Sequence, residues 1–206
     1  MLNYSKRLLI VCEDCKSSKL YFESFKRDEK LKRHLASVSI EVVHPKDHSP
    51  LGLVIEAKTK KLKARKNRNP YDEIWIVLDK DYHANIEKAF DMAYANKFKI
   101  ALSVICFEYW VLLHFEKTKK PFKKCADVIS YIRKKHHPNY LKQENTYYDL
   151  KDRLDIAINN GKWIVNQNQT DIDRGVKIYE LAAYTDVHLL VERLLNAEDL
   201  ILKNKI

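Results

Sequence analysis

Residues 73–81 read Glu73-Ile-Trp-Ile-Val-Leu-Asp-Lys-Asp81, a short apolar run that ends in two aspartates. An uninterrupted apolar run of this length is typical of a strand buried on both faces, as the strands of parallel sheets are. We therefore predict a buried strand over 73–78, with acidic side chains immediately after it.

The same kind of pattern recurs on both sides of this stretch. Further strands are expected over 7–12, 38–44 and 99–103, and helical spacing of apolar residues is found over 16–35, 51–66 and 84–96. Strands that alternate with helices predict a parallel sheet covered by helices on both sides. The first half of the chain is thus expected to have an α/β fold.

The second half has a different pattern. An aromatic-rich segment over 106–115 is followed by helical patterns over 127–135, 147–160 and 186–203. We predict an α/β core over 1–115 and a helical extension over 116–206 that packs on it.

Composition excludes several classes of protein. The chain has 206 residues, 46% of them hydrophobic, with only 3 Gly and 5 Pro, which argues against collagen-like or low-complexity architectures. Its longest apolar runs are far shorter than the ~18 residues that span a membrane. The run Leu8–Cys12 is also shorter than the ~7–15 residues of a signal peptide's apolar region. We expect a cytoplasmic protein with reduced cysteines.

The charge favours a polyanionic partner. Lys and Arg number 38 and Asp and Glu 28, a formal net charge of +10, which favours nucleic acid. The residues expected to contact it lie in an acid-free run and near two strand ends: Lys58, Lys60, Lys61, Lys63, Arg65, Lys66 and Arg68, with Lys16, Lys80 and His83. The alternatives for this run are a solvated helix face and a surface that docks an acidic protein.

Acidic residues follow two of the predicted strands. Glu13 comes directly after the first strand, and Asp79 and Asp81 follow the third. Parallel sheets bind ligands at the carboxyl ends of their strands, and residues two apart in an extended chain point the same way. If the two strands are neighbours, the three carboxylates meet. Such an oxygen-only set suits Mg²⁺ or Mn²⁺, which would activate water and neutralise a phosphoryl group. The alternative is that the acids cap helix N-termini.

Other candidate residues are less specific. Glu108 either reaches the metal centre from the end of the fourth strand or pairs with a lysine, while His114 and His188 are expected to be structural. The pair Cys12 and Cys15 has zinc-like spacing, but the remaining two cysteines form no second such pair. A zinc site is therefore not predicted.

Four stretches of the chain carry more specific residue combinations. They are Ile10-Val-Cys-Glu13-Asp-Cys-Lys16 with Tyr21-Phe22, Trp75-Ile-Val-Leu-Asp79-Lys-Asp81-Tyr-His83, Cys106-Phe-Glu108-Tyr-Trp110-Val-Leu-Leu-His114-Phe115, and Thr185-Asp-Val-His188. Together they resemble the motifs of RloB-like proteins. The chain departs from the usual pattern at Asp14, where the family has Gly, and at Ser103-Val-Ile105, where it has Ser-Asn-Pro.

The resemblance implies a Toprim-like (Rossmann-like) fold and a nuclease of bacterial anti-phage defence that works with a partner P-loop ATPase. Combined with the carboxylates, it predicts a magnesium- or manganese-dependent enzyme that cleaves RNA such as tRNA, or DNA. Glu13, Asp79 and Asp81 would bind the metal, and Glu108 would complete the catalytic set. Two alternatives stay open: a non-catalytic module that binds nucleic acid or the ATPase, and a haloacid-dehalogenase-type phosphatase with Asp79 as nucleophile. A homodimer is also left open.

Overall fold

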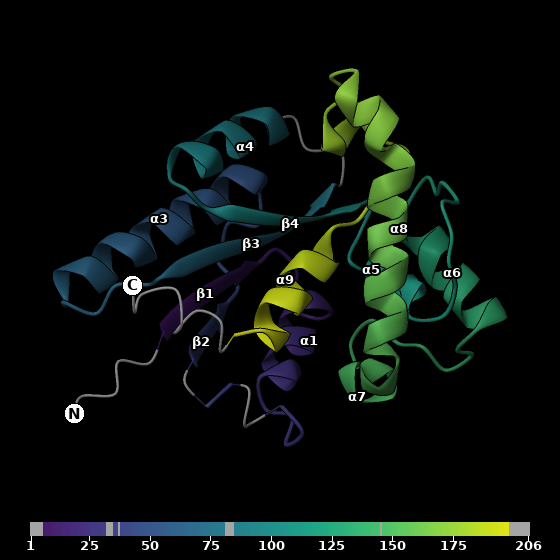
Figure 1. The fold of residues 1–206 in the computed structure, drawn as a ribbon, viewed down its shortest axis with the longest axis horizontal. Coiled ribbons are helices and arrows are strands. Elements are labelled where there is room, and N and C mark those ends of the chain that lie inside the picture. Colours follow the sequence, from purple (N-terminus) through teal and green to yellow (C-terminus); the bar gives the residue numbers. More distant parts are fainter. Residues whose placement is uncertain (1–5, 32–34, 37, 81–84, 145, 198–206) are drawn as a thin grey trace.

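The sheet is parallel throughout and has the predicted strands. The computed structural model describes residues 6–31, 35–36, 38–80, 85–144 and 146–197. The strands β1 (Lys6–Cys12), β2 (Val38–Val43), β3 (Glu73–Lys80) and β4 (Lys99–Val104) form a four-stranded sheet in the order β2-β1-β3-β4 (Figure 1). Strands β1 and β3 are neighbours, with Leu8 opposite Glu73. The protein thus has the α/β, Rossmann-like fold that the alternating pattern predicts.

The continuous apolar runs are explained by burial on both faces. In β1, Leu8 and Ile10 belong to one hydrophobic core, whereas Leu9 and Val11 belong to the core on the opposite face. All four are completely buried. Successive side chains of a strand point to opposite faces, so a strand covered on both sides needs apolar residues at every position.

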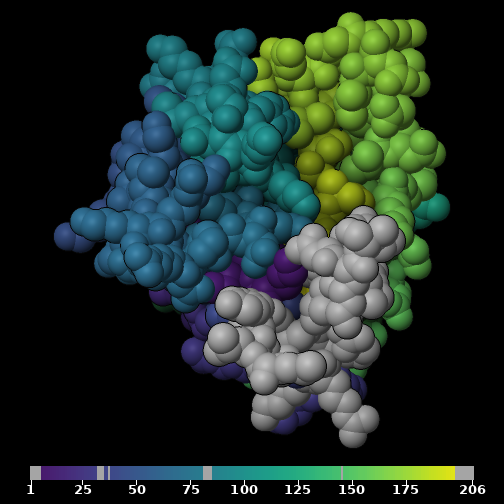
Figure 2. All heavy atoms as spheres, turned by 60° about the vertical axis from the view of Figure 1, so that its left-hand side comes forward, coloured from purple at the N-terminus to yellow at the C-terminus, as the bar shows by residue number. Residues whose placement is uncertain are grey.

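Two helices cover one face of the sheet. They are α3 (Pro50–Lys66) and α4 (Ile86–Ala95), close to the predicted ranges. The start of α3 is defined by Ser49, whose side chain accepts a hydrogen bond from the Gly52 N–H (3.1 Å), and by Pro50 in the first turn. In Figure 2, α3 (blue) and α4 (teal) lie side by side on the surface.

The other face is covered by α1 and by the helices of the second half. These are α1 (Ser18–Phe25), α5 (Glu108–Leu113), α6 (Cys125–Lys135), α7 (Tyr147–Leu150), α8 (Leu154–Asp173) and α9 (Val187–Leu195), with 3₁₀ turns at Lys151–Arg153 and Ile178–Glu180. They share one hydrophobic core with this face of the sheet. The helical segment therefore packs on the α/β part, while the domain boundary after residue 115 stays a prediction.

Several helices differ from the sequence prediction. The helix expected over 186–203 ends at Leu195, and the one expected over 147–160 is divided by the 3₁₀ turn at Lys151–Arg153. Helix α1 ends at Phe25, well before residue 35, because the buried Asp28 accepts a hydrogen bond from the Lys30 N–H (2.9 Å) and another from the Tyr147 hydroxyl (2.9 Å). Such side-chain bonds compete with helical ones. Helix α8 continues far beyond residue 160, and Gly161 lies inside it, where a Cβ would contact His188 of α9.

The C-terminal motif attaches α9 to the edge strand β4. Thr185 forms an antiparallel bridge with Ser103, and their hydroxyls lie 3.0 Å apart. Asp186 accepts the Leu102 N–H at 2.6 Å, and burial raises the pKa of this carboxyl to about 7. Within the described residues, no helix combines the length and the apolar character needed to cross a membrane.

Candidate metal centre

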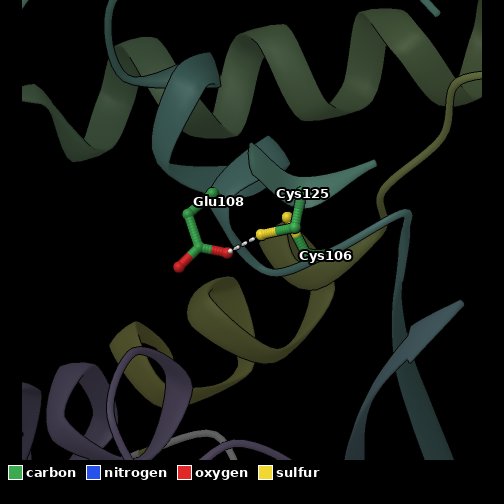
Figure 3. A group of neighbouring side chains, drawn as sticks. All are labelled: Cys106, Glu108 and Cys125. Atoms are coloured by element: carbon green, nitrogen blue, oxygen red, sulfur yellow. Dashed lines mark hydrogen bonds between the residues drawn. The ribbon is translucent and has the colours of Figure 1, made fainter. Parts of the chain in front are cut away.

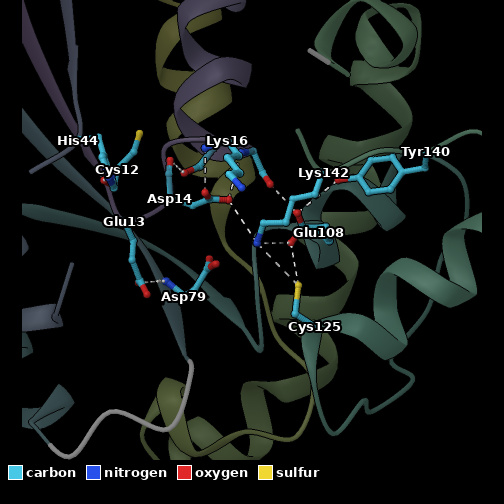
Figure 4. A network of polar contacts seen from close by, with 12 residues as sticks. Cys12, Glu13, Asp14, Lys16, His44, Asp79, Glu108, Cys125, Tyr140 and Lys142 are labelled. Carbon is cyan, nitrogen blue, oxygen red and sulfur yellow. Dashed lines mark hydrogen bonds and ion pairs between the residues drawn. The ribbon is translucent and has the colours of Figure 1, made fainter. Parts of the chain in front are cut away.

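The ends of β1 and β3 are joined by two hydrogen bonds. The Glu13 N–H donates to the Val77 carbonyl at 3.1 Å, and the Asp79 N–H donates to Glu13 Oε2 at 2.8 Å (Figure 4). The Glu13 carboxylate therefore lies at the end of β3. This is the arrangement expected if the two strands are neighbours.

The Asp79 carboxyl has a strongly raised pKa. Its side chain is buried, with 8% exposed. Burial raises the pKa of Asp79 well above its usual value, and the nearby Glu13 and Glu108 carboxylates raise it further, while Lys142 opposes them. The structure thus places three of the predicted catalytic carboxylates near one another, those of Glu13, Asp79 and Glu108. We call these three residues the acid cluster.

Glu108 reaches this cluster from the first turn of α5. It is completely buried. Its Oε1 accepts hydrogen bonds from Ser17 Oγ (2.5 Å) and the Tyr140 hydroxyl (3.4 Å), and its Oε2 accepts one from Cys125 Sγ (3.1 Å). Its carboxylate also pairs with Lys142, which is the lysine pairing considered for Glu108. Glu108 lies close enough to raise the pKa of Asp79 as well, while its role as a metal ligand stays a prediction.

The link from β4 to α5 is strained. Ile105 has φ of +78°, in the left-handed region that a β-branched residue rarely adopts. It lies where the chain departs from the Ser-Asn-Pro pattern. The turn at Ile105 connects the end of β4 to the start of α5 and so determines where Glu108 enters the cluster.

Lys142 is a member of the cluster that sequence patterns missed. Its ammonium lies 3.3 Å from Asp14 Oδ2 and 3.6 Å from Glu108 Oε2. Burial acts to lower the pKa of Lys142, but the carboxylates of Glu108 and Asp14 outweigh it and raise the pKa above its usual value. The residue lies in a polar stretch between α6 and α7, where neither spacing nor a motif distinguishes it from other lysines.

Asp14, which replaces the usual glycine, stabilises the loop after β1. Its carboxylate accepts the N–H groups of Lys16 (2.8 Å) and Ser17 (3.1 Å), just before α1 begins. Burial acts to raise the pKa of Asp14, but these N–H groups and Lys142 hold it below its usual value. Both N–H groups precede α1, whose N-cap Ser17 makes no side-chain capping bond, so Asp14 orders the loop and does not cap the helix as considered for such acids.

The remaining predicted residues lie at the rim or outside the described part. Lys16 is exposed on the loop after β1, and Lys80 is half-buried at the last position of β3. Asp81 and His83 lie outside the described residues.

The basic run lies elsewhere. It follows the exposed side of α3, and Arg65, Lys66 and Arg68 lie at the end of that helix. The next residue, Asn69, accepts a hydrogen bond from the guanidinium of Arg7 at the start of β1. Glu13 follows the other end of β1, six residues or ~20 Å away at 3.3 Å per residue. The structure does not bring the basic run of 58–68 close to the Glu13 carboxylate. That this run binds nucleic acid stays a prediction.

Both histidines considered structural are buried in the core. The Nδ1 of His114 lies 3.0 Å from the Trp110 carbonyl and its Nε2 lies 3.4 Å from the Tyr21 hydroxyl. Burial lowers the pKa of His114 to about 4, and it does the same for His188 on α9. Both side chains are therefore neutral at pH 7.

The cysteines do not cluster as their spacing suggests. Cys12 is buried in the core, whereas Cys15 is exposed. Among the described residues, the ligand atoms that do converge belong to Cys106, Glu108 and Cys125, which lie within 4.8 Å of one another (Figure 3). Sequence reasoning missed this group because its members come from two separate segments.

Comparison with known proteins places the chain in a family. Neither the curated proteins nor the solved structures contain a match. The family model described as RloB-like protein matches residues 8–194, which include every member of the acid cluster and Lys142. We conclude that this chain belongs to the RloB-like protein family.

Proposed function

We propose that this protein is a Toprim-like, metal-dependent nuclease that hydrolyses phosphodiester bonds of nucleic acid. The observation that carries the proposal is the proximity of Glu13 and Glu108 to Asp79 at the carboxyl end of a parallel sheet, close enough for both carboxylates to raise its pKa. Open α/β sheets bind their ligands at this edge. Asp81, two residues after Asp79 in the chain, would add a fourth carboxylate.

The donor set fits Mg²⁺ or Mn²⁺. All three described side chains offer carboxylate oxygens, which are the ligands that hard divalent cations prefer. Burial raises the pKa of Asp79, and the neighbouring Glu13 and Glu108 carboxylates raise it further; a divalent cation among them would offset both effects. A bound Mg²⁺ would polarise a water molecule and neutralise charge on a phosphodiester.

The protein's own groups would orient this centre. The Asp79 N–H holds one oxygen of Glu13, and Ser17 holds one oxygen of Glu108, so both carboxylates are positioned before any ligand arrives. Preorganised groups of this kind reduce the cost of ordering the site during reaction. The Lys142 ammonium offers positive charge beside the same carboxylates.

The net charge supports the proposed substrate, and the family supports the proposed partner. A net charge of +10 supports a nucleic-acid substrate, either RNA such as tRNA or DNA. Membership of the RloB-like family supports a cytoplasmic role in anti-phage defence together with a P-loop ATPase. In that setting we expect the isolated chain to have low toxicity and to act within the pair or after release from it.

A second candidate is a non-catalytic module that binds nucleic acid or the ATPase. One observation favours it, namely that Lys142 already places a cation among the carboxylates. A lysine in this position can substitute for a metal ion in a site that has lost catalysis.

The deciding experiment is incubation of the protein, alone and with its ATPase, with labelled tRNA, single-stranded DNA and duplex DNA in Mg²⁺, Mn²⁺ or EDTA. We expect metal-dependent cleavage that is abolished by Asp79→Asn, Glu13→Gln and Glu108→Gln but retained by Asp91→Asn, which alters an exposed aspartate on α4. Cleavage by Asp79→Asn, or in EDTA, would contradict the proposal. Binding without cleavage supports the non-catalytic module, and a stable phosphate adduct on Asp79 supports the phosphatase.

A further inference from the structure

Two thiols and a carboxylate converge beside the acid cluster. Cys106 precedes α5, Glu108 begins it, and Cys125 begins α6. One ligand atom from each lies within 4.8 Å of the other two, and Figure 3 shows the three side chains pointing toward one another. Sulfur and oxygen donors in this combination differ in kind from the oxygen-only set of Glu13 and Asp79.

The separations are close to those of a tetrahedral zinc site. Zinc binds sulfur at ~2.3 Å and carboxylate oxygen at ~2.0–2.2 Å, which separates neighbouring ligand atoms by roughly 3.5–3.8 Å. Cys125 Sγ lies 3.1 Å from Glu108 Oε2, and no pair in the group exceeds 4.8 Å. Side-chain adjustments of about 1 Å, without movement of the helices, are sufficient for all three to contact one ion.

The surroundings orient the carboxylate toward the thiols. Glu108 Oε1 is held by Ser17 Oγ and the Tyr140 hydroxyl, which leaves Oε2 facing Cys125. Hydrogen bonds to the non-ligating atoms of a metal ligand commonly fix its orientation in this way. The group therefore has both ligands and the supporting contacts of a built site.

Charge balance favours exchange of protons for a divalent ion. Lys142 Nζ lies 3.6 Å from Glu108 Oε2 and 4.0 Å from Cys125 Sγ. In the metal-free protein Cys125 Sγ donates a hydrogen bond to Glu108 Oε2, and zinc-class ions bind cysteine as the thiolate, so binding would release the two thiol protons. Replacement of two thiol protons by one divalent ion leaves the net charge of the cluster unchanged. Binding then creates no unpaired charge in a buried place.

We propose that Cys106, Glu108 and Cys125 bind a thiophilic divalent cation of the zinc class. Three protein ligands leave a fourth position for water or another exogenous ligand, as in open zinc sites. Half-buried Cys125 provides the path from solvent, because the other two ligands are buried. Mg²⁺ does not bind thiolates well, so this site and the carboxylate centre select different metals although they share Glu108. The binding does not depend on the proposed nuclease activity.

The test uses Co²⁺, whose thiolate complexes absorb in the near ultraviolet and visible. The full-length protein, kept reduced with a phosphine under argon, is titrated with Co²⁺ and then with Zn²⁺. We expect one Co²⁺ per chain with thiolate absorption, displacement by Zn²⁺, and release of about two protons per ion. Cys106→Ser and Cys125→Ser should lose the absorption, and Glu108→Gln should weaken binding. Cys15→Ser, which alters an exposed cysteine, is the matched control and should keep the absorption.

A second measurement covers variants that fail to fold. In the wild-type protein, Zn²⁺ should slow alkylation of Cys125 by iodoacetamide at least tenfold while leaving exposed Cys15 reactive, as mass spectrometry of the labelled peptides would show. The proposal is overturned by wild-type protein without thiolate absorption, by absorption that survives Cys106→Ser, or by equal protection of both cysteines. None of these readouts requires cleavage, so loss of the nuclease proposal would leave them unaffected.

Discussion

The Lys142 ammonium lies 3.6 Å from Oε2 of Glu108, which is completely buried. This ion pair joins the polar stretch after α6 to the first turn of α5, and the same ammonium also contacts Asp14 on the loop after β1. The helical segment therefore contributes the positive charge that balances the carboxylates at the edge of the sheet.

Lys142→Met should lower the stability of the metal-free protein and increase the rise in Tm that Mg²⁺ causes. Removal of the ammonium leaves Glu108 without its ion-pair partner, and we expect a loss of roughly 1–3 kcal/mol in the free energy of unfolding. Because a competing cation is gone, Mg²⁺ should raise the Tm of this variant more than that of the wild type. Thermal unfolding with EDTA and with Mg²⁺ measures both effects. Lys124→Met, at an exposed position next to α6, is the control and should behave as wild type.

Asp79→Asn should stabilise the metal-free protein at neutral pH. The folded pKa of Asp79 is raised above its unfolded value of about 3.9, so ionisation of this group costs stability as pH rises from about 4 towards the folded pKa. Asparagine keeps an oxygen that can accept the Phe107 N–H, which Asp79 accepts in the structure. Urea unfolding in EDTA should show little difference from wild type at pH 4 and greater stability of the variant at pH 7.5. An equal difference at both pH values would show that ionisation of Asp79 does not lower the stability of the folded protein.

The exposed side of α3 should account for part of the salt dependence of nucleic-acid binding. Replacement of the exposed residues Lys58, Lys63, Arg65 and Lys66 by Gln should reduce the slope of log K against log salt by up to about 3.6, because each lost phosphate contact removes ~0.7–0.9. Binding to a labelled oligonucleotide at several salt concentrations measures this.

The control for the α3 surface is the double substitution of Lys60 and Lys61. These side chains already contact Glu41 (2.7 Å) and the Asn96 carbonyl (2.9 Å), so their replacement should change the slope less. An unchanged slope in the fourfold variant, with folding intact, would assign the run to solubility or to docking of an acidic protein.

Arg68→Gly should stabilise the protein. Arg68 has φ of +55° just after the end of α3, where the Asn69 N–H donates to the Ala64 carbonyl at 2.9 Å. Glycine adopts this left-handed conformation without the steric penalty of a side chain, so we expect a gain of about 0.5–1 kcal/mol in the free energy of unfolding. The matched control is Lys66→Gly in the last turn of α3, which should cost up to about 1 kcal/mol. A loss of stability in Arg68→Gly would show that the left-handed conformation of Arg68 is not a source of instability.

Gly161→Ala should destabilise the protein even though alanine favours helices. A Cβ at this position of α8 would lie 2.7 Å from His188 Nδ1 and 2.9 Å from His188 Cβ, so α9 would have to move. We expect a loss of roughly 1–3 kcal/mol in urea unfolding. The exposed Asn159→Ala on the same helix should be neutral or stabilising.

The double variant Gly161→Ala/His188→Ala tests the cause of this loss. If the steric contact is responsible, the double variant should lose less stability than the sum of the two single variants. Additive losses would assign the effect of Gly161→Ala to something other than the His188 ring.

Local sequence patterns were sufficient for the sheet and for part of the site. The apolar runs in β1 and β3 can be satisfied only by burial on both faces, and this local property predicts parallel strands without knowledge of their partners. The placement of Glu13 beside Asp79 was predicted for the same reason, since residues that follow neighbouring parallel strands meet at one edge. Where a helix end depended on a distant contact, as at Asp28 with Tyr147, the local pattern was wrong.

The rest of the site depends on how α5, α6 and the segment before α7 pack together. Lys142 and Cys125 lie in stretches whose spacing carries no chemical signal, and they become partners of Glu108 only because α5 and α6 pack in one hydrophobic core. Burial then gives these groups their chemistry, because a carboxylate, an ammonium and a thiol that water would solvate separately must find partners in one another once they are enclosed. Spacing along the chain predicts which residues share a strand end, whereas the packing of helices decides which charges and thiols meet.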